Sequence, residues 1–223
     1  KHNLYRQPFE RIRDLVMAWK VMDLDTIVKK YDLKTNCIGH VGAWKAREIS
    51  NYKRIFGDVT VIFVEANKKL KPYIDENIKS YENVRCEYIA LGSEVSKGIL
   101  NLHEIEGSTG QSSSLLEPYL HPSIGTETIE VEITTADILF SNDPVDFLSI
   151  DVQGYELEVL KGATNILPNV DTLIVEVNRT EQYKDCALVQ DLDQYLKSFN
   201  LTRVETEWWG DKEDWGDALY IKK

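Results

Sequence analysis

An apolar strand runs into an amphipathic helix within VDFLSIDVQGYELEVLKGA, residues 145–163, and this stretch decides the fold. Asp151 closes the apolar run FLSI at the carboxyl end of the predicted strand. Ligands of open α/β sheets bind outside the carboxyl ends of the strands, so chemistry is expected at Asp151. The following helix repeats its apolar residues at helical spacing, with Leu157, Leu160 and Ala163 on the buried face. A second interpretation stays open, in which Asp151 caps the helix that begins near Gly154.

Composition indicates one domain and limits the class of partner. The chain has 223 residues, a net charge of -11 and 43% hydrophobic residues, enough for a sizeable core. No basic stripe offers a surface for nucleic acid or an anionic membrane, and no apolar run approaches a membrane span. The three cysteines, an odd number without metal-type spacing, favour reduced thiols and a cytoplasmic location. The first residues, KHNLY, resemble neither a signal peptide nor a native start, so we expect a part of a longer multidomain chain.

Short β-rich runs alternate with segments of helical period after about residue 35, which predicts βαβ units around a mostly parallel sheet. Strands are expected at Asn36–Val41, Val59–Glu65, Val84–Ala90, Val145–Asp151, Thr172–Val177, Leu201–Glu207 and Ala218–Lys222, and half-solvated strands at Ile99–His103 and Ile129–Ile133. Helices are expected at Lys45–Phe56, Lys68–Tyr81, Tyr155–Ala163 and Ala187–Phe199. Residues 1–31 are expected to form a helical extension, with one or two helices over Phe9–Tyr31 packed on the domain of residues 32–223.

A long polar loop is predicted between Glu106 and Thr128. It contains Gly110, Gln111 and three consecutive serines from Ser112. Loops of this length without their own secondary structure are typically lids or binding loops. A disordered surface excursion is the alternative.

The first predicted strand leads into the turn GHVGAWKA, residues 39–46, and the second ends at Glu65. Small residues in such a turn let the backbone approach a ligand and direct N–H groups at it. An acid about twenty residues further on is suited to accept both ribose hydroxyls of a nucleotide-like cofactor. The spacing G-x-x-G, with Ala46 four residues later, does not meet the dehydrogenase fingerprint and disfavours a nicotinamide dinucleotide.

Seven short motifs in order over residues 37–222 resemble the FkbM-type S-adenosylmethionine-dependent methyltransferases. They are Gly42-Ala43, Val64-Glu65-Ala66-Asn67, Ala90-Leu91-Gly92, Gly110-Gln111-Ser112-Ser113-Ser114-Leu115-Leu116, Ile150-Asp151-Val152-Gln153-Gly154-Tyr155-Glu156-Leu157, Glu176-Val177-Asn178 and Trp215-Gly216-Asp217-Ala218. The resemblance implies a class I methyltransferase fold, a Rossmann-like three-layer α/β sandwich whose seven-stranded, mostly parallel sheet has an antiparallel last strand. It also implies methyl transfer to an oxygen, often on a sugar, a glycan or another small-molecule hydroxyl.

Two positions depart from the family pattern. Much of the family has an acid before Gly-Ala and then Asn-x-Gly, whereas this chain has His40 and the run Trp44-Lys45-Ala46. A subgroup with His-Val-Gly-Ala resembles this chain at His40. The missing glycine at Ala46 predicts a wider turn or a side-chain contact in place of a backbone contact.

Site residues follow from these motifs. The cofactor contacts are expected at His40, Gly42, Ala43, Trp44, Glu65, Ala66, Asn67, Ala90, Leu91, Ser113, Asp151 and Gln153. Asp151 is the first candidate base for the acceptor proton, Glu156 the second, and Glu176 completes an acidic rim.

Other roles for these residues stay open. Asp151, Glu176 and Asn178 are hard oxygen donors that Mg²⁺ accepts, so a metal-assisted mechanism is an alternative to one without metal. His40 could contact the cofactor carboxylate or shuttle a proton, or it could be a satisfied turn residue. Trp208, Trp209 and Trp215 could stack on a sugar ring or pack in the core. The alternative for the whole chain is a non-catalytic α/β domain that binds a glycan or a protein.

Overall fold

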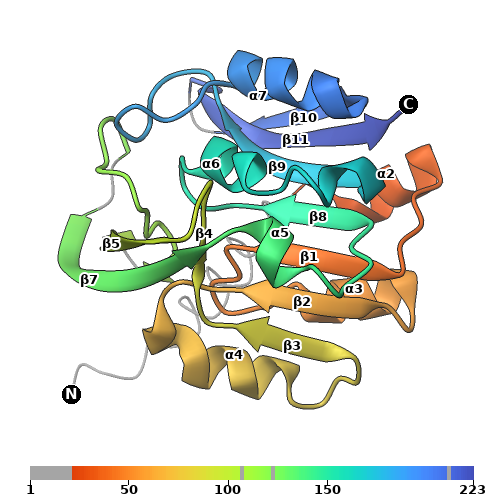
Figure 1. The fold of residues 1–223 in the computed structure, drawn as a ribbon, viewed down its shortest axis with the longest axis horizontal. Coiled ribbons are helices and arrows are strands. Elements are labelled where there is room, and N and C mark those ends of the chain that lie inside the picture. Colours follow the sequence, from red (N-terminus) through yellow and green to blue (C-terminus); the bar gives the residue numbers. More distant parts are fainter. Residues whose placement is uncertain (1–21, 106–107, 122–123, 210–211) are drawn as a thin grey trace, which may run out of the picture.

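The computed structural model describes residues 22–105, 108–121, 124–209 and 212–223. Its central feature is a seven-stranded sheet in the order β10-β11-β9-β8-β1-β2-β3 (Figure 1). The strands are β1 (Cys37–Val41), β2 (Thr60–Val64), β3 (Val84–Glu87), β8 (Phe147–Ile150), β9 (Thr172–Asn178), β10 (Leu201–Trp209) and β11 (Trp215–Lys222). Only β11 runs against its neighbours, β9 and β10. The predicted three-layer fold with an antiparallel last strand is confirmed.

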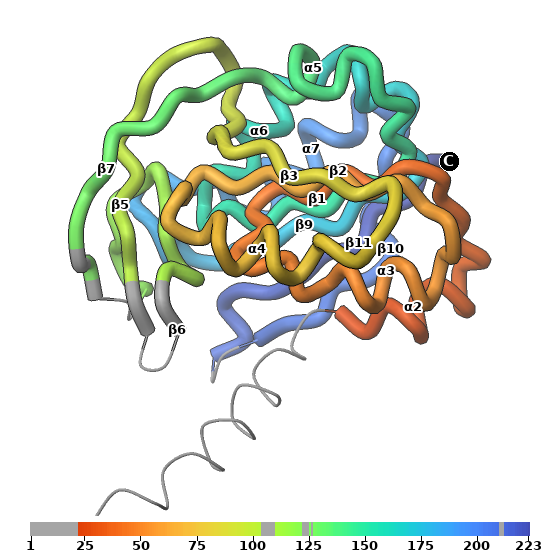
Figure 2. The backbone as a smooth tube through the Cα atoms, turned by 90° about the horizontal axis from the view of Figure 1, so that it is seen from below, coloured from red at the N-terminus to blue at the C-terminus, as the bar shows by residue number. Residues whose placement is uncertain are grey.

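Helices cover both faces of this sheet (Figures 1 and 2). They are α2 (Leu24–Tyr31), α3 (Ile49–Phe56), α4 (Lys71–Ile78), α5 (Ala136–Leu139), α6 (Glu156–Lys161) and α7 (Val189–Leu196), with 3₁₀ turns at Lys68–Leu70, Leu167–Asn169 and Lys197–Phe199. The first three pack their apolar residues on the face that carries Ile38, Phe63 and Phe147. The last three pack on the opposite face. Among the described residues, none of these helices is long and apolar enough to span a membrane.

A smaller sheet extends from the carboxyl side of the main one. It has the order β4-β7-β5-β6 and consists of β4 (Ala90–Leu91), β5 (Ser96–Ile105), β6 (Ser108–Thr109) and β7 (Ile124–Thr134). Leu100, Val131 and Ile133 form its buried core. The predicted half-solvated strands are therefore real and longer than expected.

Three predicted elements are wrong at their boundaries. The single strand Val84–Ala90 divides into β3 and β4, which belong to different sheets. The loop Glu106–Thr128 is shorter, because β7 already begins at Ile124. The helix expected from Lys45 begins at Ile49, since Trp44 and Ala46 have φ of 46° and 52° and cannot continue a right-handed helix.

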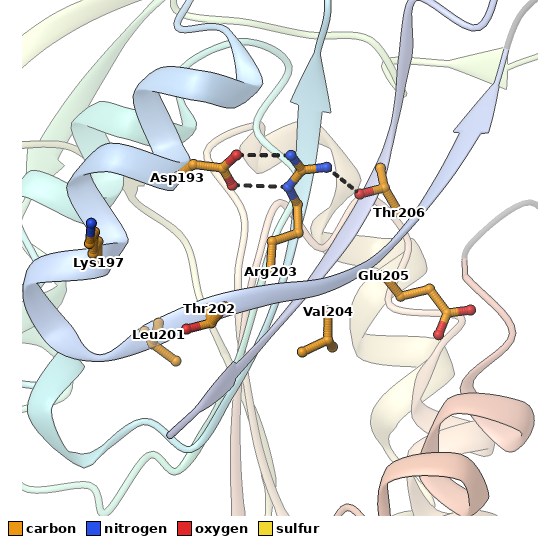
Figure 3. Close-up of a pocket in the computed structure, with 8 residues that line it drawn as sticks. All are labelled: Asp193, Lys197, Leu201, Thr202, Arg203, Val204, Glu205 and Thr206. Atoms are coloured by element: carbon orange, nitrogen blue, oxygen red, sulfur yellow. Dashed lines mark hydrogen bonds and ion pairs between the residues drawn. The ribbon is translucent and has the colours of Figure 1, made fainter.

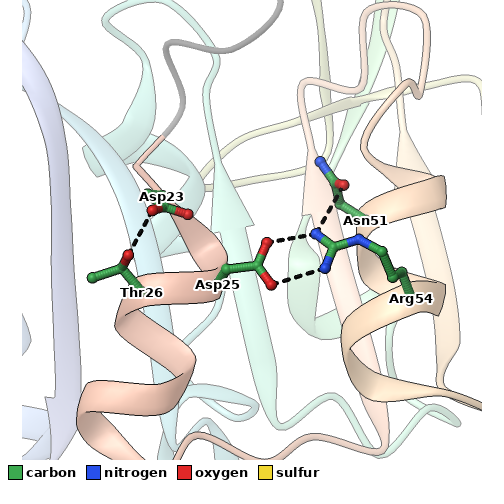
Figure 4. Close-up of polar contacts among 5 residues, drawn as sticks. All are labelled: Asp23, Asp25, Thr26, Asn51 and Arg54. Atoms are coloured by element: carbon green, nitrogen blue, oxygen red, sulfur yellow. Dashed lines mark hydrogen bonds and ion pairs between the residues drawn. The ribbon is translucent and has the colours of Figure 1, made fainter.

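Helix α2 is fixed to the domain by a bidentate ion pair (Figure 4). The guanidinium of Arg54 on α3 donates to both oxygens of Asp25, at 2.8 and 2.5 Å. Ile27 is buried against the main sheet. The rest of the predicted helical arm, residues 1–21, lies outside the described residues.

At Gly42 the backbone after β1 lies directly against the backbone after β8. Gly42 has φ of 88°, and a Cβ at this position would lie 1.7 Å from the carbonyl oxygen of Asp151. The amide of Asp151 donates to the carbonyl of Val41 at 2.9 Å, which holds the two backbones together here. The glycine is therefore required by the β1–β8 junction itself.

Gly42→Ala is expected to destabilise the protein by more than the ~1–2 kcal/mol that a left-handed alanine costs, because the methyl group meets backbone that cannot rotate away. Gly57→Ala is the matched control: Gly57 has φ of 72°, and a Cβ at this position would meet open space. Urea unfolding of both variants measures the difference. Equal losses of unfolding free energy would show that the β1–β8 contact is not tight.

Candidate functional site

The predicted site residues gather at the carboxyl edge of the parallel strands. Gly42 directly follows β1, Glu65 follows β2 and Asp151 follows β8, and these strands are neighbours in the sheet. β9 contributes Glu176 and Asn178. Parallel strands end at the same edge, so four separate parts of the chain meet there.

The backbone of the glycine turn does not behave as expected. The N–H groups of Gly42 and Ala43 both donate to the carbonyl of Val64, at 2.9 and 3.1 Å. The prediction that they point at a ligand is wrong, because the β1–β2 ladder continues into the turn. Trp44, the next residue, lies against two cations, with Lys45 Nζ 4.6 Å and Arg47 Cζ 4.9 Å from its ring centre.

Glu65 is a buried carboxylate that ties the turn to β2. Oε2 accepts from the N–H of Trp44 and Oε1 from the N–H of Asn67, both at 2.7 Å. Burial raises its pKa to about 7, against the backbone donors that lower it. A carboxylate has about four lone-pair sites, so the two oxygens can still accept two hydroxyl groups.

The loop of residues 110–116 spans both halves of the site. A Cβ at Gly110 would lie 3.1 Å from Asn67 Nδ2, at the β2 side. Ser113 accepts from the N–H of His103 and donates to the carbonyl of Gly110, while Ser114 donates to the carbonyl of Gln153 at 2.6 Å, at the β8 side. The loop is thus positioned across the strand ends, and Ser113 holds its shape.

Asp151 and Glu176 share one donor. Gln153 Nε2 donates to Asp151 Oδ1 at 2.7 Å and to Glu176 Oε2 at 2.8 Å. The other end of the same amide, Oε1, accepts from the hydroxyl of buried Tyr183 at 2.7 Å. That bond fixes which way the amide faces, because reversing it would place an acceptor against two carboxylates.

The turn after β8 gives Asp151 a different role from a helix cap. α6 has no side-chain cap at its N-terminus, so the capping interpretation of Asp151 is wrong. Glu156 instead organises the turn, because its Oε1 accepts from the N–H groups of Val152 and Gly154 at 3.1 and 2.9 Å. Glu156 is only 1% exposed, so its carboxyl group faces the protein interior and not solvent.

The carboxyl groups at this edge have raised pKa values. Burial raises the pKa of Glu176 well above its usual range, and the charge of Asp151 raises it further. The residue Asp151 is exposed, but the protein atoms around its carboxyl group exclude part of the water, which raises the pKa of that group. The hydrogen bond from Gln153 acts in the opposite direction and lowers this pKa. Burial also raises the pKa of Glu156 to about 7.

His40 is a strand residue with its own partner. Its Nδ1 lies 2.8 Å from the hydroxyl of Tyr52, and its ring packs against Phe63 at 5.3 Å between centres. Burial lowers its pKa to about 4, so the ring is neutral at pH 7. His40 thus has a hydrogen-bond partner, but it lies within β1 and not in the turn, so its interpretation as a turn residue is wrong.

The acidic edge continues beyond β9. Asp217 on β11 pairs in register with Glu176, and it accepts from the N–H of Met22 at 3.3 Å and from Trp209 Nε1 at 3.2 Å. Burial raises its pKa to about 7. Asn178, the last residue of β9, is fully buried, and within the described part of the chain neither of its side-chain polar atoms has a hydrogen-bond partner.

The remaining predicted residues lie around this edge. Ala90 and Leu91 are buried in β4, and Ala66 packs against the core of the smaller sheet. Among the described residues, no group of three His, Cys, Asp or Glu side chains is arranged to hold a metal ion. All three cysteines are free thiols.

A groove of about 540 Å³ lies elsewhere, between α7 and the start of β10 (Figure 3). Two of its charged residues pair with each other, since Arg203 donates to both oxygens of Asp193 at 2.9 and 2.8 Å. β10 runs parallel to β9, so its start lies at the opposite edge of the sheet from the acids. This groove is separate from the candidate site.

Sequence reasoning missed two residues of the site. Tyr183 lies in an irregular segment where no periodicity marks it. Asp217 stands in the motif Trp215-Gly216-Asp217-Ala218, but it was given no site role, because only the β9–β11 register brings it beside Glu176.

Comparisons with known proteins agree with this geometry. No curated protein matches the chain. Among solved structures, the chain resembles a methyltransferase FkbM from Methylobacillus flagellatus with 13% identity and a TM-score of 0.58, covering 84% of this chain but only 43% of that one. It resembles a SAM-dependent methyltransferase from Aquifex aeolicus with 12% identity and a TM-score of 0.52, covering 97% and 98%.

A putative tRNA methyltransferase of Streptococcus pneumoniae, solved with S-adenosyl-L-methionine, has 13% identity and a TM-score of 0.52, covering 91% of this chain and 73% of that one. At these identities the likenesses show the fold alone. A family model, the methyltransferase FkbM domain, matches residues 36–201. The chain therefore belongs to the FkbM family of S-adenosylmethionine-dependent methyltransferases.

Proposed function

We propose that the chain is an O-methyltransferase that acts on a hydroxyl of a sugar, a glycan or a similar small molecule. The observation that carries this proposal is the pair Asp151 and Glu176, held by one amide of Gln153 at the strand ends beside the glycine turn. Methyl transfer to oxygen needs an aligned hydroxyl and a group that removes its proton. A solvent-accessible carboxylate in a fixed position meets the second need.

The donor set fits S-adenosylmethionine on the β1–β2 side. Glu65 has lone pairs left for two ribose hydroxyls. His40 Nδ1 is not free for the cofactor, because it already bonds the hydroxyl of Tyr52. When bound, the cofactor supplies an electrophilic methyl group on a sulfonium. Asn67 and the loop at Gly110 close the same side, and Trp44 with its two cations lies next to the turn.

Asp151 is the proposed base. A C–O bond forms as the methyl–sulfur bond breaks, the hydroxyl proton passes to Asp151, and a methyl ether and the neutral thioether leave. Gln153 keeps Asp151 oriented, and Glu156 keeps the turn in place. The loop of residues 110–116, bonded to Gln153 through Ser114, is proposed as the lid that excludes water.

The organisation of the chain is part of the proposal. Residues 32–223 form the methyltransferase domain and residues 1–31 an extension, of which α2 packs on it. We place the protein in the cytoplasm, since its three thiols are free. A longer multidomain protein fits the 43% coverage of the Methylobacillus structure.

Titration calorimetry with S-adenosylmethionine and its demethylated product tests the cofactor site. The protein is expected to bind both, and Glu65→Ala to weaken binding by about 1–3 kcal/mol because the ribose hydroxyls lose a charged acceptor. Glu205→Gln, which changes an acid on the far strand β10, is the control. Absence of heat at millimolar cofactor would favour a non-catalytic domain.

Asp151→Asn is expected to lower kcat by about 10²–10⁴ while leaving the dissociation constant of the cofactor near the wild-type value. Asp171→Asn, at the opposite end of β9, is the matched control. Wild-type kcat in Asp151→Asn would remove Asp151 from the mechanism. Loss of activity with a chelator and its return with Mg²⁺ would instead support a metal held by Asp151, Glu176 and Asn178.

The pH profile of kcat/KM is expected to lose activity on the acid side above the ordinary range of an aspartate. The base must be ionised, and its pKa is raised, so activity falls as the pH drops through that raised pKa. Steady-state rates across pH measure the position of this limb. A limb at the ordinary aspartate value would show that Asp151 does not titrate under these constraints.

A further inference from the structure

We propose that the acceptor carries a protonated amine, as an amino sugar does, and that this amine binds on the sheet face formed by Glu176, Asp217 and Asn178. The inference rests on the proposed function and names the class of acceptor that the same site selects. It depends on three observations: the register of β9 and β11, the negative charge of the acids there, and the side-chain amide of Asn178.

The strand register places these side chains on one face. Glu176 is opposite Asp217 in the antiparallel β9–β11 pair, and Asn178 is opposite Trp215. Side chains alternate along a strand, so residues two apart share a face. Glu176 and Asn178 therefore point to the same side as Asp217, and Trp209 reaches this side to bond Asp217.

No described cation balances this charge. Among the described residues, the ion pairs formed by lysine and arginine all lie elsewhere, and none includes Asp151, Glu176 or Asp217. Gln153 holds Asp151 and Glu176 within about 5.5 Å of each other, the sum of its two bonds. Burial raises the pKa of these acids, so a cation bound here first favours their ionised form and then gains attraction from several carboxylates at once.

The sulfonium of the cofactor cannot balance all of these acids. The cofactor side is β1 and β2, whereas Asp217 lies three strands from β1, on β11. Neighbouring strands are about 5 Å apart, so Asp217 is roughly 14 Å from the glycine turn. The acids beyond Asp151 therefore face the acceptor side.

Asn178 is the independent sign of a ligand. Its side chain is fully buried, yet Nδ2 and Oδ1 have no hydrogen-bond partner among the residues that the structure describes. A buried amide without partners destabilises the folded protein, and that cost is recovered when a ligand supplies a donor and an acceptor. A hydroxyl next to an ammonium group offers both to Asn178 while the ammonium meets Glu176.

The tryptophans at this end favour the same ligand. Trp209 and Trp215 pair across β10 and β11, next to Asn178, and both are partly exposed. Aromatic faces attract cations and pack against the C–H face of a sugar. Phosphorylated or carboxylated sugars would instead bring like charge against the acids.

The test compares matched acceptors. Methyl glycosides of glucosamine and N-acetylglucosamine present the same hydroxyls with and without an ammonium group. Methyl glucoside replaces the amine with a hydroxyl, and the galacto and manno series vary the configuration of the ring. Methyl transfer is measured by mass detection, and calorimetry measures sugar binding to the protein saturated with demethylated cofactor. The amine is expected to exceed its N-acetyl form about tenfold or more in kcat/KM and affinity, and to lose that advantage as salt rises.

Asp217→Asn keeps an acceptor for Met22 and Trp209 but removes the charge, and it is expected to reduce the amine preference about tenfold. Asp171→Asn, at the other end of the sheet, is expected to keep the preference. Equal use of amine and N-acetyl forms, or a preference unchanged in Asp217→Asn, would overturn the inference while leaving the proposed function intact. Absence of cofactor binding would overturn the proposed function, and calorimetry of the same sugars with the protein alone would still decide amine recognition.

Discussion

A single amide nitrogen holds together two carboxylates that would otherwise repel each other. Gln153 donates to Asp151 and Glu176, and Tyr183 fixes the amide from behind. Two like charges within about 5.5 Å are costly in a site of low dielectric unless a donor lies between them. The rest of the site depends on that donor being in place.

The backbone at Gln153 is shaped for this task. Gln153 has φ of 59° and Gly154 φ of 98°, so two consecutive residues are left-handed. A Cβ at Gly154 would lie 3.0 Å from Tyr183, which explains why the tyrosine can pack so closely. Glu156 accepts from two N–H groups of the turn, and Ser114 donates to the carbonyl of Gln153. These hydrogen bonds offset the backbone strain at Gln153.

The sequence allowed the layers of the fold and most strand positions to be predicted, because buried parallel strands are continuous apolar runs. It did not allow the break between β3 and β4, since Tyr88 and Ile89 continue the β-rich pattern and only sheet membership separates the strands. The helix start at Ile49 was missed because Trp44 and Ala46 are poor candidates for left-handed backbone. Such conformations are imposed by the tertiary structure.

The strand-end acids could be predicted from their positions after apolar runs, but their partners could not. Glu65 looked like a free ribose acceptor, and the structure shows both oxygens already holding backbone N–H groups. His40 looked like a turn residue, and its bond to Tyr52 crosses from β1 to α3. Contacts between distant segments leave no trace in local sequence pattern.

The outer strand β10 has a consequence for how copies of the protein meet. Its pairing with β11 shifts register between Arg203 and Glu205, and Glu205 is held by Lys30 and Tyr31 of α2. An irregular edge with a charged side chain anchored beside it is a poor template for another strand. The outer edge of β10 therefore does not favour the addition of a strand from a neighbouring molecule.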